Sequence, residues 1–429
     1  MMRPELSVSH LPTEPLTASH QPVTSRGSWQ FTAGLLSIST FMEVIAMGHL
    51  EAFTPLFLEH NLGVPDSDVP RWTGLLAAAT MAVAMPFAPF WGVLADRYNR
   101  KLIILRSLLI GSVAYAVAAL STDVWQFLGM KLLFGLTFAS HGIVVGAIAF
   151  LAPDKRIGLA IGLIQMMMPL GRSIGPVFGS WLIAQFGLRG MFAADALLTG
   201  AAFTMLLLLL REPPKSRDST QSVLGRLGTV TRLILWQKAI RLLFILNFAV
   251  ALMNSLINPF VPVAIDRVYE GENVAFVIGL TLAGYGGLAA VSAPIAGRLG
   301  DRFGPERVLL FAMIGLGLMA FGLTLATTPL QIALVVMVGA VPFGAQTTSG
   351  YSLLARIAPR EHMVGIMGLS PMARNAAMLI GPLIGAAVAG IGLWAVFAAA
   401  TVTSTVAVGL NLMLVRTLAA GSSQDPTVG

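Results

Sequence analysis

The amino-acid sequence predicts an all-α membrane protein with twelve transmembrane helices in two pseudo-symmetric bundles of six. The first reason is composition: the mean hydropathy is +0.79 and only 11% of the 429 residues are charged, which excludes a soluble globular protein. The second reason is the number of apolar stretches that are long enough to cross a bilayer. The third is a short charged sequence that occurs twice.

A transmembrane helix needs about 20 apolar residues to cross about 30 Å of hydrocarbon. Twelve stretches meet this requirement and are separated by short connections: 33–58, 72–95, 102–121, 124–150, 157–184, 188–210, 241–265, 274–299, 306–325, 329–355, 363–391 and 393–415. The predicted domains are a disordered tail at 1–28, bundles at 29–211 and 241–416, a linker with a surface helix at 212–240 and a tail at 417–429.

The basic residues predict the orientation of these spans. Of the 27 lysines and arginines, 21 fall on the side of the membrane where both termini lie, and the positive-inside rule makes that side cytoplasmic. The tail before the first span has no apolar core, so it is not a signal peptide. The chain has no cysteine, which excludes disulfides and thiolate metal sites. We expect no metal and no nucleic-acid partner.

The charged sequence follows the second span and returns in the second half of the chain. Asp301 and Arg302 repeat Asp96 and Arg97 at an offset of 205 residues. A plain cytoplasmic loop would explain one copy. Two matched copies indicate a duplicated membrane bundle.

The first span contains two carboxylates and an imidazole, from Glu43, Glu51 and His49. Ionisable residues inside a membrane are functional candidates by default. The two glutamates lie eight residues apart, about 12 Å along a helix and about 80° around it, so both can face one aqueous cavity. We interpret them as proton carriers; solvation near the outer end of the span is the alternative. His49 is interpreted as a hydrogen-bonded packing residue, and a proton relay is the alternative.

The fourth span contains Lys131 without a neighbouring acid in the sequence. A lysine in that position either extends to the membrane surface or pairs with an acid from another helix.

The fifth span has small residues at a regular spacing: Gly162, Gly171, Gly175, Pro176 and Gly179. This pattern predicts a bent helix with a smooth face for close packing. The same span carries Gln165 and Arg172, seven residues apart and so nearly on one face. A buried arginine needs an anionic partner. Pairing with Glu43, Glu51 or Asp195 and contact with a substrate both stay open.

The second half of the chain has an asparagine at the position that corresponds to a glutamate of the first half. Asn258 corresponds to Glu51 at an offset of 207 residues and continues a polar stripe with Asn254. The asymmetry predicts that coupling chemistry lies in the first half, although asparagines also bond helices together. Further polar side chains inside the later spans are Tyr285, Gln346 and Arg374.

These motifs resemble the major facilitator superfamily over residues 30–416. The sequence at 92–101 is similar to the family signature between the second and third spans, with Asn99 in place of the usual glycine. The glycines of the fifth span resemble the antiporter motif of the family's exporters, with Ser180 in its last position. Lys131 stands where the family often has an arginine that is linked to proton transfer.

Within the family, Trp72-Thr-Gly, Pro89-Phe-Trp-Gly92 and Trp125-Gln126 look most like the bacterial twelve-span drug/proton antiporters. The resemblance implies a monomeric inner-membrane transporter, with both termini cytoplasmic, that exports amphipathic small molecules in exchange for protons (multidrug efflux). The coupling ion is H+, no cofactor is needed, and the bilayer and the cargo are the partners. The alternative is a dedicated exporter of one metabolite, such as a siderophore or a lipid-like compound.

An enzyme is not expected, because the sequence lacks a nucleophile motif, a phosphate loop and a histidine-rich metal site.

The predicted transport function assigns roles to three groups of residues. Proton coupling is assigned to Glu51, Glu43 and Lys131. Substrate binding is assigned to Glu51, Gln165, Arg172, Asn254, Asn258, Tyr285, Gln346 and Arg374. A cytoplasmic gate is assigned to Gly92, Asp96, Arg97, Arg100, Asp301 and Arg302.

Overall fold

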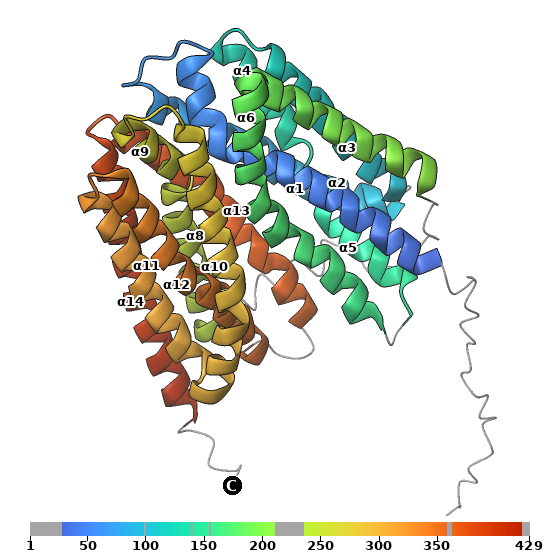
Figure 1. The fold of residues 1–429 in the computed structure, drawn as a ribbon. Helices are drawn as coiled ribbons and strands as arrows, with labels where there is room; N and C mark the ends of the chain where they lie inside the picture. The colour runs from blue at the N-terminus through green and yellow to red at the C-terminus, as the bar shows by residue number, and fades with distance from the viewer. Residues whose placement is uncertain are drawn as a thin grey trace, which may run out of the picture.

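The computed structural model describes residues 28–97, 100–138, 140–153, 156–210, 236–357 and 363–422. Within these ranges the regular structure is helical and contains no strand. Figure 1 shows the helices in two bundles, one for each half of the chain. The predicted tail before the first span and most of the predicted linker at 212–240 lie outside the described residues.

The first bundle holds six spans made from six helices. These are α1 (Ser28–His60), α2 (Val69–Arg97), α3 (Arg100–Leu120), α4 (Val124–Gly135), α5 (Ser140–Leu151) and α6 (Ile157–Leu209). Helices and spans do not correspond one to one: α4 and α5 together form one span, and α6 forms two.

The fourth predicted span, 124–150, consists of two helices and not of one continuous helix. Each of its two helices has 12 residues, which is too short to cross a bilayer alone. The break follows α4, where the hydroxyl and the amide of Thr137 both donate to the carbonyl of Phe134 and the amide of Leu136 donates to the carbonyl of Leu133. Local hydroxyl bonds of this kind compete with helix continuation.

The fifth and sixth spans meet at Gly187, which has φ 69° and ψ 177°. Only glycine adopts that backbone region readily. The chain reverses there, so α6 is a hairpin of two legs, 157–186 and 188–209. These legs match the predicted spans.

The second bundle contains α8 (Lys238–Ile257), α9 (Val261–Val268), α10 (Val274–Phe303), α11 (Pro305–Leu325), α12 (Pro329–Ile357), α13 (Met363–Val388) and α14 (Leu393–Ser422). Among the described residues, 8 helices are long and apolar enough to span a membrane, with α8 and α9 counted as one and α6 long enough for two spans. The α4–α5 pair, α2 and α13 complete the twelve. The predicted fold class is confirmed.

Close packing between α1 and α6 depends on small residues. A Cβ atom at Gly171 would lie 2.7 Å from Val44 Cγ1, and one at Gly175 would lie 3.1 Å from the carbonyl oxygen of Ile45. Gly162, at the start of the same leg, has nothing within 4 Å. The glycines therefore differ in what they do: two admit the backbone of α1 and one does not touch it.

The two bundles meet at the face opposite the chain termini. There α2 packs on α13 and α6 packs on α10, and the guanidinium of Arg267 donates to the carbonyl of Asp66 at 3.0 Å. A Cβ at Gly279 of α10 would lie 2.6 Å from the Pro176 carbonyl oxygen. Figure 1 shows the bundles spreading apart toward the ends where the described chain begins and stops. The molecule is thus closed at one face and parted at the other.

Replacement of Gly171 by alanine is expected to destabilise the first bundle by about 1–3 kcal/mol, because the added methyl group overpacks the contact with Val44. Thermal unfolding of the purified protein in detergent measures the change. Gly162→Ala is the matched control on the same leg and should be neutral or slightly stabilising, since open space surrounds it and alanine favours a helix. Equal melting temperatures for the two variants would contradict the assigned packing.

Candidate functional site

Three polar side chains within six residues of α1 each meet a charged group from another helix. His49 contacts Asp195, Glu51 contacts Arg172 and Thr54 accepts a hydrogen bond from Lys131. We call these six residues the α1 polar cluster. Burying a polar or charged group inside a membrane without a partner costs free energy. The contacts of the cluster therefore explain how the first span can contain His49, Glu51 and Thr54.

Glu51 and Arg172 form a loose ion pair. Arg172 Nη2 lies 3.5 Å from Glu51 Oε1, and the side chains are 44% and 53% exposed. Of the acids that the sequence left open as partners of the arginine, Glu51 is the one that the structure brings into contact with it. Tyr285 of α10 lies within electrostatic range of Arg172, and Ser173 lies against Gly286 of the same helix. The pair therefore lies where the two bundles meet.

Lys131 does not extend to the surface, because its side chain is only 6% exposed. Its ammonium group donates to Thr54 Oγ1 at 3.2 Å and lies 5.7 Å from the centre of the Phe127 ring. The Thr54 hydroxyl in turn donates to the carbonyl of Leu50. The lysine thus joins α4 to α1 one turn from Glu51, with which it interacts electrostatically.

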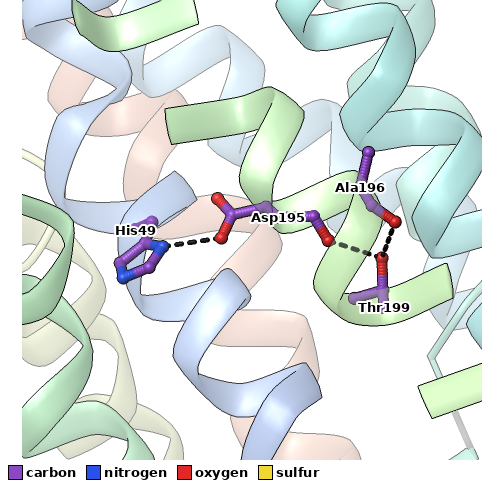
Figure 2. Close-up of polar contacts among 4 residues, drawn as sticks. All are labelled: His49, Asp195, Ala196 and Thr199. Atoms are coloured by element: carbon purple, nitrogen blue, oxygen red, sulfur yellow. Dashed lines mark hydrogen bonds and ion pairs between the residues drawn. The ribbon is translucent and has the colours of Figure 1, made fainter. Parts of the chain in front are cut away.

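His49 and Asp195 form the most enclosed polar contact of the cluster, which Figure 2 shows between α1 and the second leg of α6. His49 Nδ1 and Asp195 Oδ1 are 2.7 Å apart, and the side chains are 0% and 1% exposed. A Cβ at Gly179, on the first leg of α6, would lie 2.6 Å from His49 Cδ2. The imidazole therefore fits against one leg and bonds to the other.

Each member of this pair also has a buried polar atom with no hydrogen-bond partner among the described residues, His49 Nε2 and Asp195 Oδ2. Thr199 does not reach the carboxylate, because its hydroxyl donates to the backbone carbonyls of Asp195 and Ala196 (Figure 2). The sequence reading missed this pair as a site. The available signal was one acid in the middle of the sixth span, whose one other charged residue is Arg189 at its start, together with a histidine in the first span.

The predicted site residues of the first bundle also include Glu43 and Gln165. Glu43 is half-buried on α1, two turns before Glu51. Gln165 is exposed on the first leg of α6. Their predicted roles in proton coupling and substrate binding stay predictions.

In the second bundle, the predicted polar residues lie on four helices or beside them. Asn254 donates to the carbonyl of Val250 on its own helix at 3.0 Å, and its Oδ1 is enclosed with no partner among the described residues. Asn258 follows α8 and is exposed, as is Arg374 on α13. Tyr285 and Gln346 lie half-buried on α10 and α12, and the tyrosine hydroxyl is enclosed without a described partner.

The predicted gate is described only in part. Gly92, Asp96 and Arg97 lie on α2, but their side chains are outside the described part of the structure. In the second copy, Asp301 pairs with Arg356 of α12 at 3.4 Å. The remaining two members are Arg100, which is half-buried on α3, and Arg302, whose guanidinium lies 5.2 Å from the Phe303 ring. The aspartate of the second copy is thus held within its own bundle.

The sequence model of the Major Facilitator Superfamily matches residues 36–268 and 243–428. The chain belongs to this family. It is 31% identical over 379 residues to the multidrug resistance protein MdtG of Serratia proteamaculans, covering 86% of this chain and 90% of that protein. It is 27% identical over 370 residues to the multi-drug resistance efflux pump PmrA homolog of Lactococcus lactis, with the same coverage.

Solved structures agree on the fold. The nucleoside transporter NupG aligns with a TM-score of 0.75 at 15% identity, covering 89% of this chain and 98% of that one. A bacterial homolog of the lysosomal transporter Spinster aligns with a TM-score of 0.73 at 16% identity, covering 92% and 98%. Membership and fold together make the chain a multi-pass membrane transporter of small molecules and not an enzyme, as the sequence predicted. In the described residues, no group of three or more histidine, aspartate or glutamate side chains could hold a metal ion.

The Lys131–Thr54 contact predicts a compensating pair of substitutions. Thr54→Val leaves the buried ammonium without its acceptor and should lower the free energy of unfolding by about 1–3 kcal/mol. Lys131→Met removes the charge while keeping most of the volume, which is often neutral or stabilising. The double variant should therefore recover the stability that Thr54→Val loses. Thermal unfolding of the four proteins measures this, and additive losses would show that the two side chains do not interact.

Proposed function

We propose that the chain exports amphipathic small molecules, including lipophilic cations, in exchange for protons. The names of the relatives support multidrug efflux, and proton coupling is supported by the contact between Glu51 and Arg172. A carboxylate that is half exposed inside a membrane span, beside one cation and at the junction of two bundles, can exchange a proton with an aqueous cavity. The same carboxylate can attract a cationic cargo.

The proposed cycle follows from the charge of Glu51. When it is ionised, it pairs with Arg172 or with the positive charge of a bound cargo. When it is protonated, that attraction is lost, the cargo leaves and Arg172 must find another partner. Proton and cargo then compete for one side chain, and competition of this kind couples their movements in opposite directions.

In the proposed alternating-access cycle, this conformation is open to the bacterial cytoplasm and closed to the outside of the cell. Both termini are then cytoplasmic. The positive-inside distribution of lysine and arginine supports this orientation. The Arg267–Asp66 contact then holds the outer face shut. Gln165, Asn254, Asn258, Tyr285, Gln346 and Arg374 would contribute polar contacts to the cargo, while Glu43 and Lys131 would assist proton transfer.

The first test of this function is uptake of ethidium into everted membrane vesicles under an imposed pH gradient. The native chain is expected to accumulate the dye, and Glu51→Gln is expected to reduce gradient-driven accumulation at least tenfold, because the amide cannot release a proton. Glu272→Gln, in an exposed loop, is the control for loss of one carboxylate. No accumulation by well-expressed native protein would instead favour a dedicated metabolite exporter.

The proposed cytoplasmic gate makes a separate prediction. Asp96→Asn keeps the shape of the side chain and removes its charge, so it should leave ethidium binding within about twofold while slowing turnover. A gate that pairs across bundles in the outward-open state contributes to the conformational change and not to the cargo site. Binding to the purified protein and transport into vesicles should be measured in parallel. Equal losses in both would count against a gate.

A further inference from the structure

We propose that His49 and Asp195 form a second proton-binding site, which takes up and releases one proton in each transport cycle independently of Glu51. This inference rests on the proposed proton coupling and extends it to a histidine that the sequence predicted as a packing residue and an aspartate that it offered as a partner of Arg172. Its basis is the 2.7 Å contact, the near-complete enclosure of both side chains and the two polar atoms without partners.

The number of protons on the pair decides its charge. With one proton, on His49 Nδ1 and shared with Asp195 Oδ1, the imidazole is neutral and the pair carries one negative charge. A second proton can bind His49 Nε2, giving an imidazolium beside a carboxylate, or can bind the carboxylate itself. In either position the pair becomes neutral overall, and no other bond is made or broken.

The surroundings favour the neutral state in the conformation shown. A net charge buried without compensation costs several kcal/mol. The neighbouring charged and titratable groups have other contacts, are acids or carry no positive charge. On α1, Glu51 pairs with Arg172 of α6, and Glu43 adds negative charge. Lys131 of α4 donates to Thr54, and Tyr115 of α3 interacts electrostatically with Asp195 but carries no positive charge.

The position of His49 links this proton to a change of shape. Its ring contacts Gly179 on the first leg of α6 and bonds to the second leg, on the two sides of the reversal at Gly187. Enclosure keeps water out, so protons reach the pair only when α1 moves relative to these legs. The closed packing therefore holds the proton more tightly than an opened packing, and that difference in affinity is the coupling free energy.

The number of protons exchanged per cargo tests the proposal. Purified protein is reconstituted in liposomes with a tenfold ethidium gradient and the membrane potential clamped at zero. The pH gradient that stops protein-dependent flux is then measured. If Glu51 and the pair each move one proton, about half a pH unit balances the native protein, because each transported proton contributes a factor of ten per pH unit. The double variant His49→Gln with Asp195→Asn should need about one full unit.

This balance point distinguishes a change in the number of transported protons from a loss of folded or active protein. Slower or less abundant protein lowers the flux but does not shift the pH gradient at which the flux is zero. Thr199→Val is the matched control, since it removes the neighbouring hydroxyl without touching the carboxylate, and it should balance at the native value. The same balance point for native protein and double variant would overturn the second site. Absence of any ethidium flux by native protein would count against the proposed function.

A direct titration tests the pair in the native protein without the double variant, and it needs the single variant His49→Gln only to assign the signal. The chain has 6 histidines, so nitrogen-15 NMR of histidine-labelled native protein can follow each ring from pH 5 to 9. The signal that is absent from His49→Gln belongs to the pair. Movement of this signal with pH supports the site, and a signal fixed across the whole range overturns it, whatever the transport assay shows.

Discussion

The approach of α1 to α6 is the contact on which the rest of the site depends. Glycines at 171 and 175 leave room for the backbone of α1, and the one at 179 leaves room for an imidazole. Larger side chains at these positions would move α1 outward. The distance between His49 and Asp195 would then exceed hydrogen-bonding range, and so would that between Glu51 and Arg172. Small residues thus determine where charges meet.

The two acid–base contacts of α1 lie in different surroundings. Glu51 and Arg172 are about half exposed, so solvent screens their attraction and the contact can open at little cost. His49 and Asp195 are enclosed, where a change of charge has a much larger effect on free energy. The first contact is suited to binding and release of a cargo. The second is suited to linking a proton to a rearrangement of helices.

Sequence reasoning reached most of the architecture because membranes constrain it strongly. Backbone groups in hydrocarbon must be satisfied by helices, so apolar length alone located the spans, including the reversal near Gly187. The break between α4 and α5 was missed because it depends on hydroxyl bonds around Thr137, which leave no change in hydropathy. The partner of Arg172 was among three named acids, but only the packing of α1 on α6 selected Glu51.

The sequence by itself determined the membrane environment, the duplication, the family resemblance and the residues that bear charge inside the spans. These properties follow from composition and local spacing, which do not require knowledge of distant contacts. The tertiary structure alone decided which charges meet. Asp195 lies 146 residues from His49 and Lys131 lies 77 from Thr54, and such pairings depend on how helices pack, which no periodicity within one span records.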